Sequence, residues 1–262
     1  MKKSYFKFLY LLICIFILSF SFISCSSNKE NNTFIIGLDD TFVPMGFRDE
    51  KNNIVGFDVD LAKEALYRLG FKVEFQPIDW SMKETELSNY NIDAIWNGYT
   101  LTKEREKKIS FTKPYLKNKQ VIITLKSSSI KNKEDLKGKK VSTQNGSSSL
   151  DALEKHRNLL NNFYSGNPIL FDTFNEAFMD LESGRTDALV VDEVLARYYI
   201  QKRGFEKFKV LNDNFGNEEY SVGLRKEDSN LLKKLNNTLE EMKKDGTISK
   251  ISTKWFGKDI TK

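Results

Sequence analysis

From residue 33 onward, short apolar runs that suit buried strands alternate with apolar residues at helical spacing. Residues 34–38 form a continuous apolar run, as expected of a strand that is covered on both faces. Residues 61–69 then carry Leu and Ala at the spacing of one helix face, and Gly70 supplies a stop signal. Residues 71–75 alternate between apolar and polar side chains, which indicates another strand. This pattern predicts an α/β architecture with mainly parallel sheets.

The same alternation continues toward the C-terminus. Further strands are expected at residues 92–96, 121–125, 141–144, 169–171, 188–191 and 220–224, and helices at residues 82–88, 150–156, 175–183, 193–202 and 229–244. Asp58, Asp60 and Ser229 stand near predicted helix starts, where we expect their side chains to act as caps. No repeat of fixed period and no linker rich in Pro or Gly interrupts the pattern, so two lobes would have to be joined by strands.

The N-terminus has the pattern of an export signal. Residues 1–7 are basic, residues 8–23 are apolar, and the small Ser24 precedes Cys25. This end resembles a bacterial lipobox, with Phe22 at a position where Leu is usual. We therefore expect a lipoprotein signal peptide over residues 1–24, a lipid-modified Cys25 and a flexible tether over residues 25–32. An uncleaved N-terminal anchor is the alternative, and both interpretations place the remaining chain outside the cytoplasmic membrane.

Composition narrows the functional classes further. The two cysteines, Cys14 and Cys25, would be lost with the signal and lipid-modified, respectively, so no disulfide is expected. The signal also carries three lysines and no acidic residue, and its removal lowers the formal net charge from +5 to +2. So small an excess of positive charge argues against a nucleic-acid-binding protein.

One stretch, residues 91–115, carries the strongest chemical signal. After the predicted strand 92–96, Gly98 allows a turn, and Thr102 is positioned to cap a short charged helix that contains Arg105. Turn N–H groups, a threonine hydroxyl and the Arg105 guanidinium would then face one opening. Such a set of donors suits a single carboxylate.

Other loops with suitable chemistry follow the predicted strands, where ligands of open α/β sheets bind. Loop 39–44 carries two carboxylates and an aromatic ring, and loop 144–148 is a small-residue segment at a helix start, which suits an anion. Asp192 follows the strand 188–191 directly. A free amino acid fits this set, with its carboxylate on Arg105, its ammonium on Asp192 and its side chain between Phe42 and Trp80.

With these residues in place, the sequence resembles the family 3 extracellular solute-binding proteins of bacterial polar-amino-acid ABC importers. The resemblance covers residues 33–262, and its markers are the segments 39–44, 56–61, 93–105, 111–115, 144–148, 187–188, 246–247 and 255–257. It implies the type II periplasmic-binding-protein fold, with two Rossmann-like lobes joined by two hinge segments. Lobe 1 would hold residues 33–116 and 222–262, and lobe 2 residues 117–221, with hinges near residues 117–120 and 216–221.

The resemblance also implies a role for each site residue. Arg105 would hold the α-carboxylate, helped by Thr100 and the Ser148 N–H. Asp192 and the Gly98 carbonyl would hold the α-ammonium, Phe42 and Trp80 would sandwich the side chain, and Asp39 would contact its polar end. Asn97, Gln144 and Ser147 complete the expected ligand-binding set. Asn97, Tyr99 and Val191 depart from the family pattern, which leaves the side-chain specificity open.

The expected protein is a lipid-anchored, monomeric receptor outside the cytoplasmic membrane, which delivers an amino acid to an ABC permease. A zwitterion can satisfy Arg105 on lobe 1 and Asp192 on lobe 2 only when the cleft closes. Glutamine or a basic amino acid is favoured as ligand, and cystine is a further candidate; no cofactor or metal is expected. The alternatives are a dehydratase-like enzyme of the same fold and a detached sensor domain. The lone His156 is expected to be exposed, which removes the usual general base.

Overall fold

The computed structural model describes residues 32–262 of the chain. The predicted signal peptide, the lipid-modified Cys25 and all of the predicted tether except Asn32 lie outside the described residues. None of the described helices combines the length and the apolar character that crossing a membrane requires.

The first sheet has helices on both faces. Its strand order is β5-β1-β6-β13-β7, with β5 (Lys72–Pro77), β1 (Thr33–Leu38), β6 (Ala94–Ile95), β13 (Gly223–Leu224) and β7 (Ser110–Phe111). The helices around this sheet are α2 (Phe57–Arg68), α3 (Lys83–Ser88), α4 (Lys103–Glu106), α9 (Ser229–Lys244) and α10 (Thr247–Phe256). Phe34 and Ile36 belong to the hydrophobic cluster that includes α2 and α9, whereas Ile35 packs on the cluster that includes α3. The unbroken apolar run of β1 therefore reflects burial on both faces, as its sequence predicted.

The second sheet is built in the same way. Its order is β10-β9-β11-β8-β12, with β10 (Ile169–Phe171), β9 (Val141–Gln144), β11 (Ala188–Asp192), β8 (Leu116–Leu125) and β12 (Phe208–Tyr220). Its helices are α5 (Ser148–Glu154), α6 (Arg157–Leu160), α7 (Phe174–Glu182) and α8 (Glu193–Arg203). Val190 packs in the cluster that includes α5 and α6, while its neighbours Leu189 and Val191 pack in the cluster that includes α7 and α8. Two α/β lobes result, each around its own sheet.

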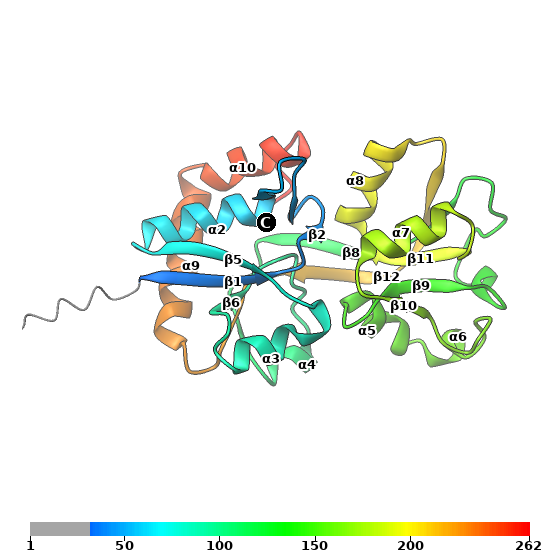
Figure 1. The fold of residues 1–262 in the computed structure, drawn as a ribbon, viewed down its shortest axis with the longest axis horizontal. Coiled ribbons are helices and arrows are strands. Elements are labelled where there is room, and N and C mark those ends of the chain that lie inside the picture. Colours follow the sequence, from blue (N-terminus) through cyan, green and yellow to red (C-terminus); the bar gives the residue numbers. More distant parts are fainter. Residues whose placement is uncertain (1–31) are drawn as a thin grey trace, which may run out of the picture. The chain divides into compact units, whose positions relative to one another are not determined.

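A two-stranded ribbon of β8 and β12 connects the two lobes (Figure 1). In this ribbon Leu116 lies opposite Tyr220, and Asn118 lies opposite Glu218. An isolated bridge between Thr100 and Tyr220 ties the end of the ribbon to the first lobe. The connection is therefore made by paired strands with regular hydrogen bonds. This agrees with the absence of a Pro- or Gly-rich linker from the sequence.

Several expectations about elements were wrong. Of the eight strand pairings in these two sheets, four are parallel and four antiparallel, so the sheets are mixed. The strand predicted at residues 220–224 is only β13, and the long β12 that precedes it was missed. Register shifts between Val210 and Asn217 break the two-residue alternation of β12, so its sequence does not show a strand pattern. Residues 41–55, expected as loop, form a small sheet of β2 (Thr41–Phe42), β3 (Gly46–Arg48) and β4 (Ile54–Val55).

The predicted capping roles of Asp58, Asp60 and Ser229 were also wrong. Gly56 and Asp228 occupy the cap positions of α2 and α9, and neither helix has a side-chain cap bond. Asp60 instead accepts hydrogen bonds from Lys254 Nζ at 2.6 Å and Trp255 Nε1 at 2.8 Å, which joins α2 to α10. An acidic residue near a helix start can bond to the rest of the fold as readily as to its own helix end.

Candidate functional site

The helix start around Arg105 forms as its sequence predicted. The Arg105 N–H donates to the Thr102 hydroxyl at 3.2 Å, which caps α4. The Arg105 side chain is buried, with its Cζ 4.8 Å from the centre of the Tyr99 ring, and its Nη1 donates to the Thr100 carbonyl at 3.0 Å. Packing against Tyr99 and the Thr100 backbone therefore fixes the guanidinium.

Arg105 also reaches from the first lobe to the second. Its Nη2 lies 3.4 Å from the Gly146 carbonyl and 3.3 Å from Asp151 Oδ2, both in the second lobe. On its own lobe, Nε lies 3.8 Å from Glu84 Oε1. Two carboxylates and two carbonyls therefore surround the guanidinium, and a ligand carboxylate would compete with Asp151 for the same nitrogen.

Lys83 is a second buried cation beside Arg105, and sequence reasoning missed it. Its Nζ donates to the Trp80 carbonyl at 3.0 Å and, across the lobes, to the Gly146 carbonyl at 2.8 Å. Burial, with a smaller contribution from the charge of Arg105, lowers the pKa of Lys83 to about 8. A lysine in a short helix is normally exposed, so its sequence gave no signal of this burial.

The turn at Gly98 requires a glycine. Gly98 has φ of 57°, and a Cβ atom there would lie 2.6 Å from Cε1 of Phe42. Its N–H donates to Asp58 Oδ2 at 2.6 Å, and the Tyr115 hydroxyl donates to the same oxygen at 2.9 Å. Burial raises the pKa of Asp58 to about 7. Asp58 thus holds the turn that leads to Thr100 and Arg105, which is a structural role in the site.

Asp192 is buried and receives three hydrogen bonds, all on Oδ1. They come from Asn118 Nδ2 at 2.5 Å, Gln120 Nε2 at 3.0 Å and the Tyr220 hydroxyl at 2.7 Å. Asp192 occupies the N-cap position of α8, but its side chain makes no cap bond to that helix and bonds to the ribbon strands instead. Burial and the nearby charge of Glu218 raise the pKa of Asp192 to about 7.

A chain of hydrogen bonds links the surroundings of Arg105 to Asp192. The Thr100 hydroxyl, in the first lobe, lies 3.1 Å from the hydroxyl of Ser148 in the second. Ser148 Oγ accepts from Gln120 Nε2 at 3.1 Å, and Gln120 also donates to Asp192. The structure therefore brings Thr100, Arg105, Ser148 and Asp192 together across the two lobes.

Asp39 and Gln144 meet across the lobes on another side of the site. Gln144 Nε2 donates to Asp39 Oδ2 at 2.8 Å, while Oδ1 accepts from the Thr41 N–H and hydroxyl. Asn97 Oδ1 accepts from the Asp39 N–H at 3.1 Å. Burial raises the pKa of Asp39. Asn97 thus positions the loop that carries Asp39.

The two predicted aromatic platforms lie in different hydrophobic clusters. Phe42 contacts Phe174 of the second lobe, with ring centroids 5.9 Å apart. Trp80 packs edge-on against Tyr99 at 5.8 Å, in the cluster beneath α3. Phe42 therefore lies at the contact between the lobes, and the Trp80 ring contributes to the core of the first lobe.

Ser147 acts on its own helix. Its Oγ accepts from the Leu150 N–H at 3.2 Å and donates to the Gln144 carbonyl at 2.7 Å, which fixes the start of α5. A signal for this bond was present, because serine is a preferred residue at a helix start. The cap orients the first turn of α5, where Ser148 and its N–H lie.

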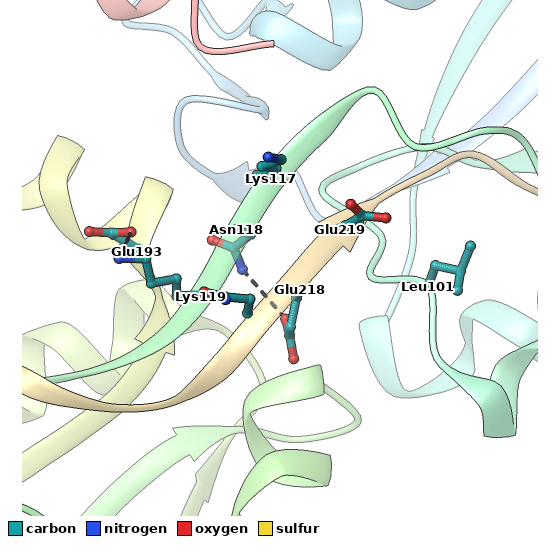
Figure 2. A pocket seen from close by; sticks show the side chains of 8 residues that line it. Leu101, Lys117, Asn118, Lys119, Glu193, Glu218 and Glu219 are labelled. Carbon is teal, nitrogen blue, oxygen red and sulfur yellow. Dashed lines mark hydrogen bonds and ion pairs between the residues drawn. The ribbon is translucent and has the colours of Figure 1, made fainter. Parts of the chain in front are cut away.

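The inward faces of the connecting ribbon supply residues that sequence reasoning missed. Asn118 and Gln120 share one face of β8, and Glu218 and Tyr220 share one face of β12. The run of four polar residues at 117–120, next to an apolar strand segment, was the available signal. Figure 2 shows Asn118 and Glu218 facing each other. Both residues line an open hollow of about 620 Å³. The residues that line this hollow include neither Arg105 nor Asp192.

Within residues 32–262, no group of three or more His, Cys, Asp and Glu side chains is arranged to hold a metal ion. His156 is exposed; its Nδ1 lies 2.9 Å from the Ala152 carbonyl, and its ring packs edge-on against Phe215. It is therefore engaged in local packing on lobe 2.

Two α/β lobes that meet over buried Arg and Asp side chains define a two-lobed solute-binding protein of the type II periplasmic fold. The chain belongs to the bacterial extracellular solute-binding proteins, family 3, whose family model matches residues 34–258. It is similar to the L-cystine-binding protein TcyJ of Escherichia coli strain K12, at 33% identity over 236 residues, 89% of this chain and 86% of the relative.

Two solved structures of amino-acid-binding proteins also resemble this chain in sequence and fold. An ABC uptake transporter substrate-binding protein from Streptococcus pneumoniae with bound histidine is 41% identical, with a TM-score of 0.86, and the match covers 92% of this chain and 99% of that one. An ancestral arginine-binding protein bound to glutamine is 43% identical, with a TM-score of 0.79, and the match covers 87% and 99%. These relatives are amino-acid-binding proteins, and this chain shares their fold over nearly its whole described length.

Proposed function

We propose that this protein binds a free amino acid between its lobes and delivers it to an ABC permease. The observation that carries the proposal is the position of Arg105 and Asp192, which belong to different lobes and are linked through Thr100, Ser148 and Gln120. A zwitterion needs a cation and an anion at a fixed separation. This pair supplies both only while the lobes are together.

The ligand would take over bonds that side chains now make to one another. Its α-carboxylate would replace Asp151 at the guanidinium of Arg105 and accept from the Ser148 N–H at the start of α5. Its α-ammonium would bind Asp192. The ligand side chain would then lie toward Phe42 and the Asp39–Gln144 pair.

The charge around the site favours a basic amino acid over glutamine. The site side chains described above comprise six carboxyl groups and two cations: Asp39, Asp58, Glu84, Asp151, Asp192 and Glu218 against Lys83 and Arg105. Asp39, Asp58 and Asp192 are buried, so solvent screens them little, and an additional positive charge on the ligand lowers the electrostatic energy. Histidine, glutamine, arginine and cystine appear in the names of the similar proteins, and they define the first ligands to test.

The segments 117–120 and 216–221 of the ribbon would act as hinges. They are the only described segments we assign to this role, because β8 and β12 carry the chain from one sheet to the other. The lipid anchor at Cys25 and the permease as partner follow from the sequence pattern of the N-terminus and from the family. The protein would act as a monomer outside the cytoplasmic membrane.

The test is a thermal-shift screen over the free amino acids, followed by calorimetry on the hits. A ligand at 100 times its dissociation constant should stabilise the protein by about 2.7 kcal/mol. Arg105→Gln removes the paired N–H donors, and at 1.5–3 kcal/mol for each charge-assisted bond it should weaken binding by about 100-fold or more. Lys103→Gln is the matched control, because it removes an exposed cation from the same helix and should leave binding unchanged.

Two outcomes would remove the proposal. One is that no amino acid raises the melting temperature; the other is that Arg105→Gln binds as tightly as the wild type. Mass spectrometry of the amino acids after incubation separates the alternative of an enzyme, because a binding protein returns its ligand chemically unchanged.

A further inference from the structure

The carboxylate of Glu218 binds residues of both lobes with one oxygen atom. Its Oε2 accepts from the Thr100 hydroxyl of the first lobe at 3.0 Å and from the Ser148 hydroxyl of the second at 3.2 Å. Gln120 Nε2, on the connecting ribbon, donates to the same oxygen at 2.8 Å. A single carboxylate oxygen therefore joins the two lobes and the strand between them.

Glu218 lies on the ribbon itself, in the segment that would act as a hinge. It stands directly opposite Asn118, whose Nδ2 lies 3.5 Å from Oε2 (Figure 2). Its neighbour Glu219 faces the other way and pairs with Lys262 near the C-terminus. Adjacent glutamates on opposite faces of one strand thus have different surroundings, which makes the second a control for the first.

These bonds can all exist only while the lobes are together. Rotation about the ribbon would carry Thr100 and Ser148 apart, because they belong to different lobes, and one oxygen atom could then stay within bonding distance of only one of them. A contact that exists in only one of two conformations shifts the population toward that conformation. We propose that Glu218 is a positioning residue that latches the closed form of the protein; this inference rests on the proposed function.

The latch is also coupled to the ligand through charge. Gln120 Nε2 donates both to Glu218 at 2.8 Å and to Asp192 at 3.0 Å, so the two carboxylates share one amide group and repel each other. The α-ammonium that Asp192 would bind offsets this repulsion. Asp192, Gln120 and Glu218 lie on neighbouring strands of one sheet, so the repulsion is present whether the lobes are apart or together, and the bound amino acid relieves it.

The experiment compares Glu218→Ala, Glu218→Gln and the control Glu219→Gln in the full chain. Dyes are attached through click-reactive amino acids at the exposed positions Tyr67 and Tyr164, one on each lobe, so that the two cysteines play no part. Single-molecule energy transfer then reports the distance between the lobes with and without arginine, and calorimetry gives the affinity. Thermal melts establish that each variant is folded.

In ligand-free Glu218→Ala we expect a smaller closed population than in the wild type, and an affinity for arginine at least tenfold weaker. Glu218→Gln keeps one oxygen acceptor without the charge, so it should lie between Glu218→Ala and the wild type. Glu219→Gln should match the wild type in both measurements. Glu218→Ala with an unchanged closed population overturns the latch, whether or not its affinity falls, because a lost affinity alone would indicate direct contact with the ligand.

Failure of the proposed function gives a different result. If the wild type binds none of the amino acids, the receptor assignment fails, but the ligand-free distances still compare Glu218→Ala with the wild type. If Glu218→Ala does not fold, the test uses Glu218→Gln, which keeps the size of the side chain. A reduced closed population in ligand-free Glu218→Gln then supports the latch, and an unchanged one overturns it.

Discussion

Replacing Asp192 with asparagine should make the ligand-free protein more stable, although it removes a residue to which we assign ligand binding. Asp192 is 3% exposed, and burial together with the charge of Glu218 raises its pKa from 3.8 to about 7. A carboxyl group whose pKa is raised on folding destabilises the folded state wherever it is ionised. Asparagine has the same shape without the charge.

The magnitude follows from the pKa. A difference of about three pKa units, at 1.36 kcal/mol for each, corresponds to ~4 kcal/mol at pH 8. All three donors bind Oδ1, and an amide oxygen can accept the same bonds, so few contacts should be lost.

Thermodynamic linkage fixes how the stability difference between Asp192→Asn and the wild type changes with pH. At a pH below 3.8 the carboxyl is protonated in the folded and the unfolded states, and the substitution should change little. Between pH 4 and 7 only the unfolded state ionises, so wild-type stability falls by about 1.4 kcal/mol for each pH unit relative to the variant. Above pH 7 the full difference is present.

Urea unfolding followed by circular dichroism, on protein freed of ligand by unfolding and dialysis, gives both stabilities at pH 5 and pH 8. Asp213→Asn is the control of opposite sign, because hydrogen bonds from Lys133 lower the pKa of Asp213, and its loss should destabilise the protein at pH 8. Equal stability of Asp192→Asn and the wild type at pH 8, or a gain of the same size at pH 5, would refute the assigned environment of Asp192. Calorimetry should in addition show that Asp192→Asn no longer binds the amino acid.

Three further substitutions test other parts of the site. Gly98→Ala should cost about 1–3 kcal/mol of stability in chemical unfolding, since alanine at positive φ is strained and its Cβ would meet Phe42. It should also weaken amino-acid binding, and wild-type stability and binding would contradict this. Trp80→Ala should destabilise the fold by about 3–5 kcal/mol in the same assay, and an unchanged stability with lost binding would instead make its ring a ligand platform. Lys83→Met should weaken ligand binding in calorimetry by removing the bond to the Gly146 carbonyl, and an unchanged dissociation constant would limit Lys83 to a role within its own lobe.

The elements that the sequence predicted well are those set by local chemistry. The strand at 141–144 has the predicted bounds, and the helix ending at Lys244 ends where predicted, because an unbroken apolar face runs along it. Thr102 caps α4 as predicted, since an N-cap bond needs only residues three positions apart. The order of strands and helices was likewise enough to give an α/β class, and the motifs along the chain gave the family.

The elements that the sequence did not give depend on distant partners. Nothing near Glu218 indicates that Thr100, Ser148 and Gln120 will surround it, because they lie 118, 70 and 98 residues away along the chain. Asp58 has the sequence position of a helix cap, but it is buried under Gly98 and Tyr115, and this contact exists only after the sheet has assembled.

The sequence by itself thus determined most of the helices and strands, the family, and the identity of the charged residues at the ends of the strands. Only the tertiary structure decided that the connecting ribbon contributes polar side chains to the site and that Arg105 is already surrounded by carboxylates. The physical reason is that periodicity and capping act over a few residues, whereas charge pairing and burial depend on which segments the fold brings together.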